Sequence, residues 1–314
     1  MKKAQLIVLG AMILLIAVAA VRLYLWNRGS VPDAEETAAD EADLDVEILD
    51  QVYRLSGDDL AGKKDDGKET ILCLGGDAFA WNYDEGLVRS IAEATGADVV
   101  NAAFLGSRVT VSSDKLDLSA HPEDVFCFYH IASDIAKGDF SDLEEAAHDR
   151  WEEDYSYQTS LDHLKEVDYA ALDTILINYG AADYFAERSC YNPDEDKMFT
   201  DLKTVTGSYA SGIRLIREAL PHVRIVLLTP SLVYTYTTEG KPVEADRLDR
   251  GHGTLITYIE FALRLGEACG VTVIDNYHGM ASEDTFADYM ADTEHFSPAG
   301  NAQVAAHVAR VLRE

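Results

Sequence analysis

The sequence predicts an α/β fold with three layers, in which helices cover both faces of a parallel sheet, preceded by one N-terminal transmembrane helix. Short runs of Ile, Leu and Val, each closed by Gly, Asn or Pro, alternate along the chain with longer amphipathic stretches. Continuous apolar strands separated by helices are typical of a parallel sheet that is buried on both faces. The N-terminus is different, because residues 4–21 carry no charge. A run of this length is sufficient for a helix to cross a bilayer.

The first segment, residues 1–30, is interpreted as an uncleaved signal-anchor. Lys2 and Lys3 precede the apolar run and Arg22 follows it. A secretory signal peptide is the alternative, since Ala-Val-Ala at 17–19 resembles a cleavage site, but the run exceeds the usual apolar region of such a peptide. The basic residues favour the N-terminus inside by about one charge. We therefore expect a single-pass protein of the cell membrane whose C-terminal domain is extracytoplasmic.

Residues 31–68 are predicted to form an acidic, flexible linker. The segment is rich in Asp, Glu, Ala and Gly, and repulsion between like charges keeps such a segment extended. The whole chain has 26 Lys and Arg against 56 Asp and Glu, a net charge of −30. A surface with this charge repels nucleic acid and anionic lipid, so neither is expected as a partner. The membrane is expected as a partner only through the N-terminal helix.

The strands and helices of one domain are expected within residues 69–314. A strand over 70–74 ends at Gly75 and Gly76, and a helix over 83–95 closes on Gly96. Further strands are expected over 98–101, 173–178, 224–229 and 271–275, and amphipathic helices over 141–167, 199–219, 253–269 and 298–313. In such a sheet the functional site lies at the carboxyl ends of the strands.

The cysteines and histidines lack the spacing of a metal site. The four cysteines form no Cys-x-x-Cys pair, and the nine histidines form no His-Glu-x-x-His motif. We therefore expect no metal, and no cofactor. Cys73 and Cys127 lie in apolar, strand-like runs and are expected to be buried thiols. Cys190 and Cys269 could pair outside the cell or remain free.

Four short blocks stand at the ends of predicted strands or before the last helix. They are Gly76-Asp77-Ala78, the segment from Asn101 to Gly106, Gly180-Ala181-Ala182-Asp183, and Asp292-Thr293-Glu294-His295 with a Ser-Pro-Ala-Gly helix start after it. A carboxylate three residues before a histidine can orient the imidazole as a general base. With these blocks, the chain from about residue 69 to 314 resembles the SGNH or GDSL hydrolase family of esterases and acylhydrolases.

The resemblance implies a flavodoxin-like sheet and a role for each block. In the family, a first-block serine attacks an ester carbonyl, the fourth-block histidine takes its proton, and the aspartate orients the histidine. The serine amide, the second-block glycine amide and the third-block asparagine hold the oxyanion. Asp292, His295 and Gly106 match this pattern, whereas Ala78 stands at the nucleophile position and Ala182 at that of the asparagine. The nucleophile and one side-chain oxyanion donor are therefore missing.

The other polar residues of these blocks are candidate binding residues. Asn101, Asp77 and Asp183 are grouped with Gly106 and Ala182 as oxyanion or substrate-binding positions. Asp77 could assist a water together with His295, although Asp in a turn more often binds local backbone amides.

Ser107, directly after the second-block glycine, is the nearest candidate for a displaced nucleophile. Serines in such loops are usually turn residues.

Three hypotheses for function remain open. The first is a membrane-anchored, extracytoplasmic protein of SGNH/GDSL type with impaired catalysis, which binds an envelope carbohydrate or an acyl ester. The second is an active carboxylic-ester hydrolase of the carbohydrate O-deacetylase type that uses Ser107 with His295 and Asp292. The third is a scaffold with a vestigial site. Ala78 and Ala182 favour the first hypothesis, and the retained histidine and aspartate favour the second over the third.

Overall fold

The computed structural model describes residues 48–83, 85–150 and 155–314. The predicted anchor over residues 1–30 and the linker up to residue 47 lie outside the described residues. Within the described ranges, no helix has both the length and the apolar character needed to span a bilayer.

A five-stranded parallel sheet forms the centre of the domain, as predicted. Its strands are β1 (Thr70–Gly75), β2 (Asp98–Asn101), β3 (Thr174–Asn178), β4 (Arg224–Leu228) and β7 (Thr272–Ile274), in the order β2-β1-β3-β4-β7. Every neighbouring pair is parallel, so the carboxyl ends of all five strands lie at one edge. The turns that follow β1 and β3 are therefore brought together there.

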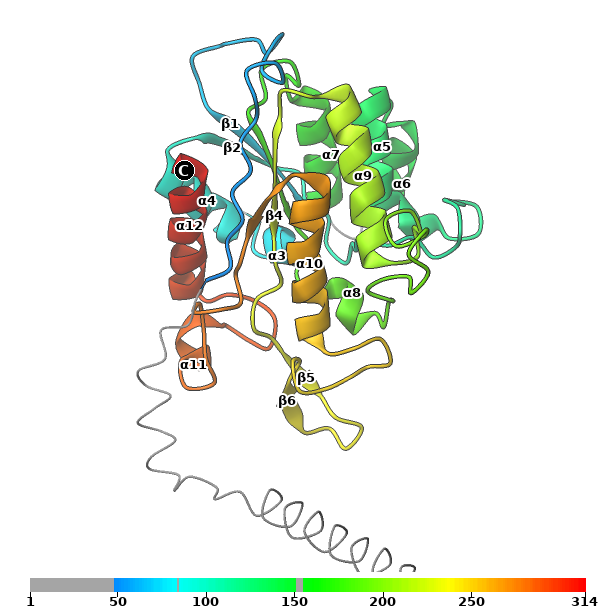
Figure 1. Ribbon diagram of the computed structural model, residues 1–314, viewed down its shortest axis with the longest axis vertical. Helices are drawn as coiled ribbons and strands as arrows, with labels where there is room; N and C mark the ends of the chain where they lie inside the picture. The colour runs from blue at the N-terminus through cyan, green and yellow to red at the C-terminus, as the bar shows by residue number, and fades with distance from the viewer. Residues whose placement is uncertain (1–47, 84, 151–154) are drawn as a thin grey trace, which may run out of the picture. The chain divides into compact units, whose positions relative to one another are not determined.

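Helices cover both faces of this sheet, which confirms the three-layer prediction. Figure 1 shows α4 (Leu87–Thr95) and α12 (Pro298–Arg313) on one face, and α5 (Phe128–Lys137), α9 (Val205–Ala219) and α10 (Leu255–Cys269) on the other. Alternate strand residues serve the two cores: Ile71 and Cys73 pack with α4 and α12, whereas Leu72 and Leu74 pack with the opposite layer.

The shorter elements complete the layers. On the α5 side these are η1 (Pro122–Phe126), α6 (Ser141–Arg150) and α7 (Ser156–Glu166). Single turns of helix follow three strands or loops: α3 (Asp77–Ala80), α8 (Ala182–Phe185) and α11 (Phe286–Tyr289). The strands β5 (Tyr234–Tyr236) and β6 (Pro242–Glu244) form a small antiparallel pair after β4.

The apolar run around Cys127 forms a helix start and not the expected strand. Cys127 is buried, as predicted, but it precedes α5, and its Sγ accepts a hydrogen bond from the His130 amide at 3.5 Å. Helix α5 ends at Gly138, which adopts a left-handed conformation. The thiols of all four cysteines are free.

Residues 48–53, which the sequence analysis placed in the linker, lie along β7 and α12. Gln51 and Val273 exchange backbone hydrogen bonds of 2.9 and 2.8 Å. The Asp50 carboxylate accepts hydrogen bonds from the Asp275 amide at 2.9 Å, and from His307 and Arg310 of α12 at 2.8 Å each. The folded unit therefore begins before residue 69.

We predict that Asp50→Ala lowers the free energy of unfolding by about 1–3 kcal/mol near neutral pH, because the Asp275 amide, His307 and Arg310 lose their shared acceptor. Burial raises the pKa of Asp50, but the hydrogen bonds from His307, Asp275 and Arg310 outweigh burial and hold this pKa below its ordinary value of 3.8. The stabilisation is therefore complete above pH 3.8 and is lost as the pH falls through the lower, folded pKa.

Urea unfolding of the wild type and the variant between pH 7 and pH 3 measures this difference. Asp58→Ala, which removes an exposed carboxylate of the same segment, is the control. An Asp50→Ala effect no larger than that of the control would contradict the assigned role.

Candidate functional site

The turn after β1 is pressed against two neighbouring backbone segments. A Cβ on Gly75 would lie 2.2 Å from the Asn178 carbonyl oxygen of β3, and one on Gly76 would lie 2.7 Å from the Ser107 carbonyl oxygen. Both separations are far inside van der Waals contact, so only glycine fits at these positions. The close approach brings the first, second and third blocks together, with Asp77 and Ala78 at the carboxyl edge of the sheet.

The fourth block forms the predicted histidine–aspartate pair. His295 Nδ1 lies 2.8 Å from Asp292 Oδ2, and the other oxygen of Asp292 accepts the backbone amides of Glu294 and His295, each at 2.8 Å. Burial raises the pKa of Asp292, but these hydrogen bonds outweigh burial and leave the pKa below its ordinary value. An ionised Asp292 accepts the Nδ1 proton, so that Nε2 is the basic nitrogen of the neutral ring.

Trp81 fixes the plane of the imidazole. Its indole stacks on His295 with ring centroids 3.9 Å apart and an angle of 18° between the planes. Trp81 directly follows α3, so the residue comes from the same turn as Ala78. The turn after β1 therefore supplies the aromatic ring that supports His295.

A hollow at the carboxyl edge, named here the site hollow, is lined by four of the predicted site residues, Asp77, Ala78, Ala182 and His295. Its lining residues are Asp77, Ala78, Asn178, Tyr179, Gly180, Ala181, Ala182, Phe185, Thr229, Ser231, Val233, Asn276, Glu294, His295 and Phe296. The cavity volume is about 40 Å³, which is space for a few water-sized groups. Ala78, Ala182 and His295 thus line the same hollow.

The Gly106 amide, the second expected oxyanion donor, already has an acceptor. It donates a hydrogen bond of 2.6 Å to Asp77 Oδ1. Gly106 has a φ of 68°, a conformation that favours glycine, and is not part of the lining of the site hollow. Asp77 therefore binds a loop amide, and the amide predicted as an oxyanion donor already has an acceptor in the structure.

The sequence matches the model of the GDSL-like lipase/acylhydrolase family over residues 73–303. The chain belongs to this family. The expected SGNH/GDSL membership is thus confirmed, and the departures at Ala78 and Ala182 are departures within the family.

Two relatives are named for ester hydrolysis. Isoamyl acetate-hydrolyzing esterase 1 homolog from Homo sapiens is 25% identical over 136 residues, which cover 43% of this chain and 53% of that protein. The Bos taurus homolog is 25% identical over 137 residues with the same coverage. The chain thus spans about half the length of the curated relatives it matches.

Two solved structures share the fold. A possible lipase from Chitinophaga pinensis DSM 2588 has a TM-score of 0.52 and 17% identity, covering 78% of this chain and 97% of that one. A protein from Lactobacillus plantarum has a TM-score of 0.53 and 14% identity, with the same coverage.

Ser107, in the second block, supports the turn after β1. Its side chain is 5% exposed, and its hydroxyl donates a hydrogen bond of 3.1 Å to the Gly75 carbonyl. Ser107 does not line the site hollow. This placement does not support the displaced nucleophile considered in the sequence analysis.

Asn101 and Asp183 are also loop supports and not part of the lining. The Asn101 amide donates to the Phe79 carbonyl at 3.0 Å and accepts from the Ala103 amide at 3.1 Å. Asp183 is fully enclosed and accepts from the Val109 amide at 2.8 Å, the Thr110 amide at 3.2 Å and the Thr110 hydroxyl at 2.8 Å. Burial raises the pKa of Asp183, while these donors oppose the rise.

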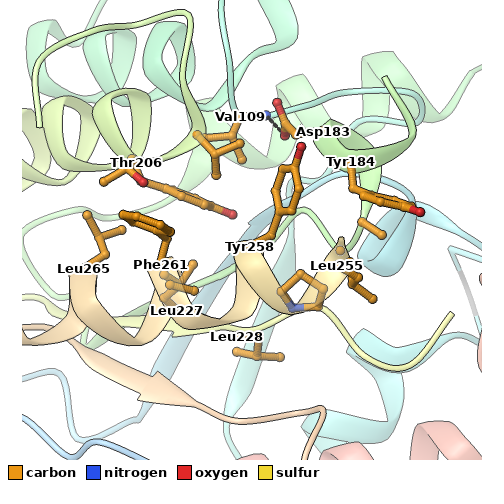
Figure 2. A pocket seen from close by; sticks show the side chains of 16 residues that line it. Val109, Asp183, Tyr184, Thr206, Leu227, Leu228, Leu255, Tyr258, Phe261 and Leu265 are labelled. Atoms are coloured by element: carbon orange, nitrogen blue, oxygen red, sulfur yellow. Dashed lines mark hydrogen bonds between the residues drawn. The ribbon is translucent and has the colours of Figure 1, made fainter. Parts of the chain in front are cut away.

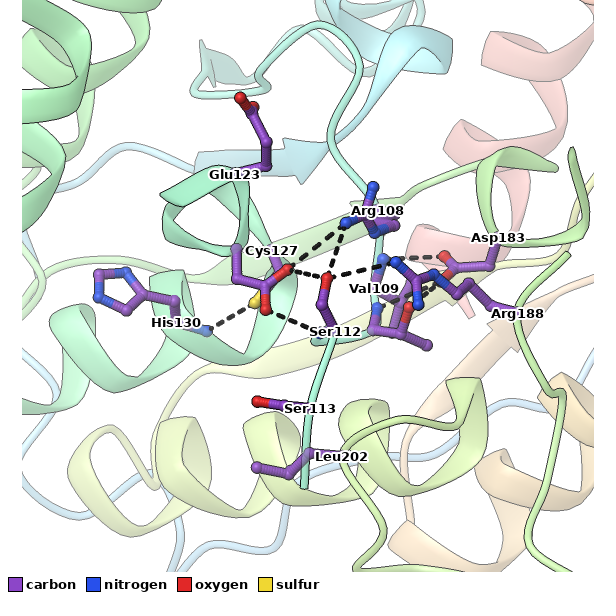
Figure 3. A network of polar contacts seen from close by, with 12 residues as sticks. Arg108, Val109, Ser112, Ser113, Glu123, Cys127, His130, Asp183, Arg188 and Leu202 are labelled. Carbon is purple, nitrogen blue, oxygen red and sulfur yellow. Dashed lines mark hydrogen bonds and ion pairs between the residues drawn. The ribbon is translucent and has the colours of Figure 1, made fainter. Parts of the chain in front are cut away.

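A second polar network continues from this loop. Figure 3 shows Ser112 between Arg108 and Arg188, each of which donates a hydrogen bond of 3.2 Å to its hydroxyl. The Ser112 hydroxyl in turn donates to Asp124 at 2.8 Å. These contacts tie the loop after the second block to the segment before α5 and to the segment after the third block.

The wall beneath the third block is apolar and tightly packed. Figure 2 shows Tyr258, Phe261 and Leu265 rising from α10 toward Val109 and Thr206. These residues line a second, apolar pocket, which shares Gly180 and Ala181 with the site hollow. Its cavity volume of about 20 Å³ leaves space for about one water-sized group. The apolar wall is therefore a support for the third block and not a ready acyl channel.

Several polar residues of the lining were not among the predicted site residues, including Thr229 directly after β4. Asn178 and Asn276 each stand at or near the end of a strand, and Ser231 follows β4. Glu294 lies within the fourth block, between the two residues that were chosen. Asn178, Ser231 and Asn276 could have been predicted from their position after strands, because the site was expected at the carboxyl ends of the strands.

We predict that Asp183→Ala lowers the free energy of unfolding by more than about 2 kcal/mol, because three buried donors lose their only acceptor. Asp183→Asn, which keeps a carbonyl oxygen, should cost less. Chemical denaturation measures both values, and Asp196→Ala, at an exposed carboxylate, is the matched control. An Asp183→Ala variant as stable as the control would show that the loop does not depend on this carboxylate.

Proposed function

We propose that this chain is a membrane-anchored, extracytoplasmic member of the GDSL-like family that binds its ligand at the site hollow without efficient ester hydrolysis. The observation that carries the proposal is the presence of Ala78 beside His295 in the lining of that hollow. The base and its orienting carboxylate are formed, but the methyl group of Ala78 can neither lose a proton nor attack a carbonyl.

The size of the expected loss in turnover supports a binding function over a catalytic one. Removal of the nucleophile in a serine hydrolase costs about a millionfold in turnover. Loss of a single oxyanion donor costs about a hundred to a thousandfold, although the two effects do not simply add. Here the asparagine is replaced by Ala182, and the Gly106 amide is bound by Asp77.

The chemistry of the lining supports a polar ligand. Two amides, from Asn178 and Asn276, and two hydroxyls, from Thr229 and Ser231, line the hollow with the carboxylates of Asp77 and Glu294. Such groups suit a carbohydrate or the polar end of an acyl ester. The names of the two relatives refer to an ester, which is consistent with an ester-bearing ligand. The envelope, as the location of that ligand, follows from the proposed anchor.

An active hydrolase with another nucleophile is less well supported. Ser107 is bound to the Gly75 carbonyl and lies outside the lining. Ser231 is the serine that does line the hollow, but the described part of the chain contains no hydrogen bond between its hydroxyl and His295. A nucleophile without contact to its base is not activated.

Turnover of p-nitrophenyl acetate by the full chain tests the proposal. We expect no rate above that of buffer for the wild type, and a measurable rate for Ala78→Ser that His295→Ala abolishes in the same background. Adding Ala182→Asn to Ala78→Ser should raise the rate by a further factor of about a hundred, since one oxyanion donor is restored.

A wild type that hydrolyses the ester, and loses this activity in His295→Ala, would overturn the proposal. In that case Ser231→Ala and Ser107→Ala would identify the nucleophile. Circular dichroism of each variant, compared with the wild type, excludes a loss of activity through unfolding.

A further inference from the structure

The ionisable groups of the site hollow are predominantly acidic. Asp77 and Glu294 line it, His295 is the one basic residue in the lining, and neither Lys nor Arg belongs to the lining. Asp292 adds a third carboxylate directly behind His295. Even with the imidazole protonated, three carboxylates face one cation when all are ionised. Anionic ligand groups are therefore repelled from this hollow.

One buried acceptor in the lining of the hollow has no donor. Asn276 is 1% exposed, and its Oδ1 has no hydrogen-bond partner in the described part of the chain, although its backbone amide donates to Thr229. A buried carbonyl oxygen without a donor is unfavourable and uncommon in native proteins. Glu294 is an exposed residue of the lining, and Asp77 accepts the Gly106 amide with one of its two oxygens. The buried Asn276 Oδ1 therefore lacks a donor in a lining that also holds two carboxylates.

The space restricts what can supply that donor. A volume of about 40 Å³ is best filled by a small group of a few heavy atoms. A primary ammonium group is small, carries three donors and no acceptor, and is positively charged. A hydroxyl group is equally small, but it brings one donor, an acceptor and no charge.

We propose that the site hollow binds the primary ammonium group of its ligand, with Glu294, Asp77 and Asn276 as acceptors. The inference rests on the proposed function, since it names the ligand class of the same site. The remainder of the ligand, such as the ring of an amino sugar, lies outside the hollow toward Trp81, which stacks on His295 and is 48% exposed. An aromatic face at this position suits stacking with a sugar ring.

The surroundings of Glu294 are consistent with this assignment. Partial burial raises the pKa of Glu294, His295 lowers it, and the charges of Asp77 and Asp292 raise it further, with a raised pKa as the net result. A bound cation relieves the repulsion among these carboxylates. Because protonation of Glu294 removes one negative charge, affinity for the cation should fall as the pH is lowered through the raised pKa of this carboxyl group.

Titration of the full chain with glucosamine and with glucose tests the inference. The two sugars differ at one position, where glucosamine has an ammonium group and glucose a hydroxyl group. The ratio of their Kd values therefore measures the contribution of the ammonium charge and its hydrogen-bond donors to binding. At 0.15 M salt we expect glucosamine to bind at least tenfold more tightly than glucose. Glu294→Gln and Asp77→Asn should each reduce this ratio to less than threefold.

Glu267→Gln is the matched control, because it removes the same charge from an exposed position on α10. This variant should keep the tenfold ratio, whereas a general attraction of amines to the acidic surface would be weakened equally in both Glu variants.

Equal binding of the two sugars by the wild type would overturn the inference and leave the proposed function intact. Binding of neither sugar would also overturn it. The proposed function fails by a separate result, ester turnover by the wild type that depends on His295.

Discussion

The close approach of the β1 turn to its neighbours is the constraint on which the site depends. Gly75 lies against the Asn178 carbonyl of β3, and Gly76 lies against the Ser107 carbonyl of the second block. The Gly76 amide also donates to Asn178 at 3.2 Å. Any side chain here would separate the blocks, so the carboxyl edge of the sheet can form one small hollow only while these two residues are glycine.

Around this turn, most of the polar groups of the four blocks have structural partners, and this changes the interpretation of the Asp292–His295 pair. Asp292 orients His295, but it also accepts two backbone amides and so closes its own turn. Asp77 binds the Gly106 amide, and Asp183 holds the loop at Val109 and Thr110. Each of these carboxylates therefore has a role in the fold that does not depend on catalysis. The presence of the aspartate and histidine is therefore weaker support for an active enzyme than it is in the sequence alone.

The sheet and its helices could be predicted because their signals are local. Continuous Ile, Leu and Val runs gave all five strands, and Gly96 and the Ser297-Pro298 pair marked a helix end and a helix start where the structure has them. The apolar run at Cys127 was wrong as a strand, since a short apolar run fits a buried helix equally well.

The contacts that could not be predicted are long-range. Asp50 binds His307 and Arg310, which are more than 250 residues away, so an acidic segment resembled a linker. The stacking of Trp81 on His295 and the capture of Gly106 by Asp77 likewise join residues that no spacing connects.

Labelling with a fluorophosphonate probe, followed by mass spectrometry, tests most directly whether the site hollow is an esterase site without its nucleophile. We predict that the wild type is not labelled, and that Ala78→Ser is labelled at position 78 in a reaction that requires His295. Labelling of the wild type at Ser231 or Ser107 would contradict this conclusion, because a serine of the native chain would then be an activated nucleophile.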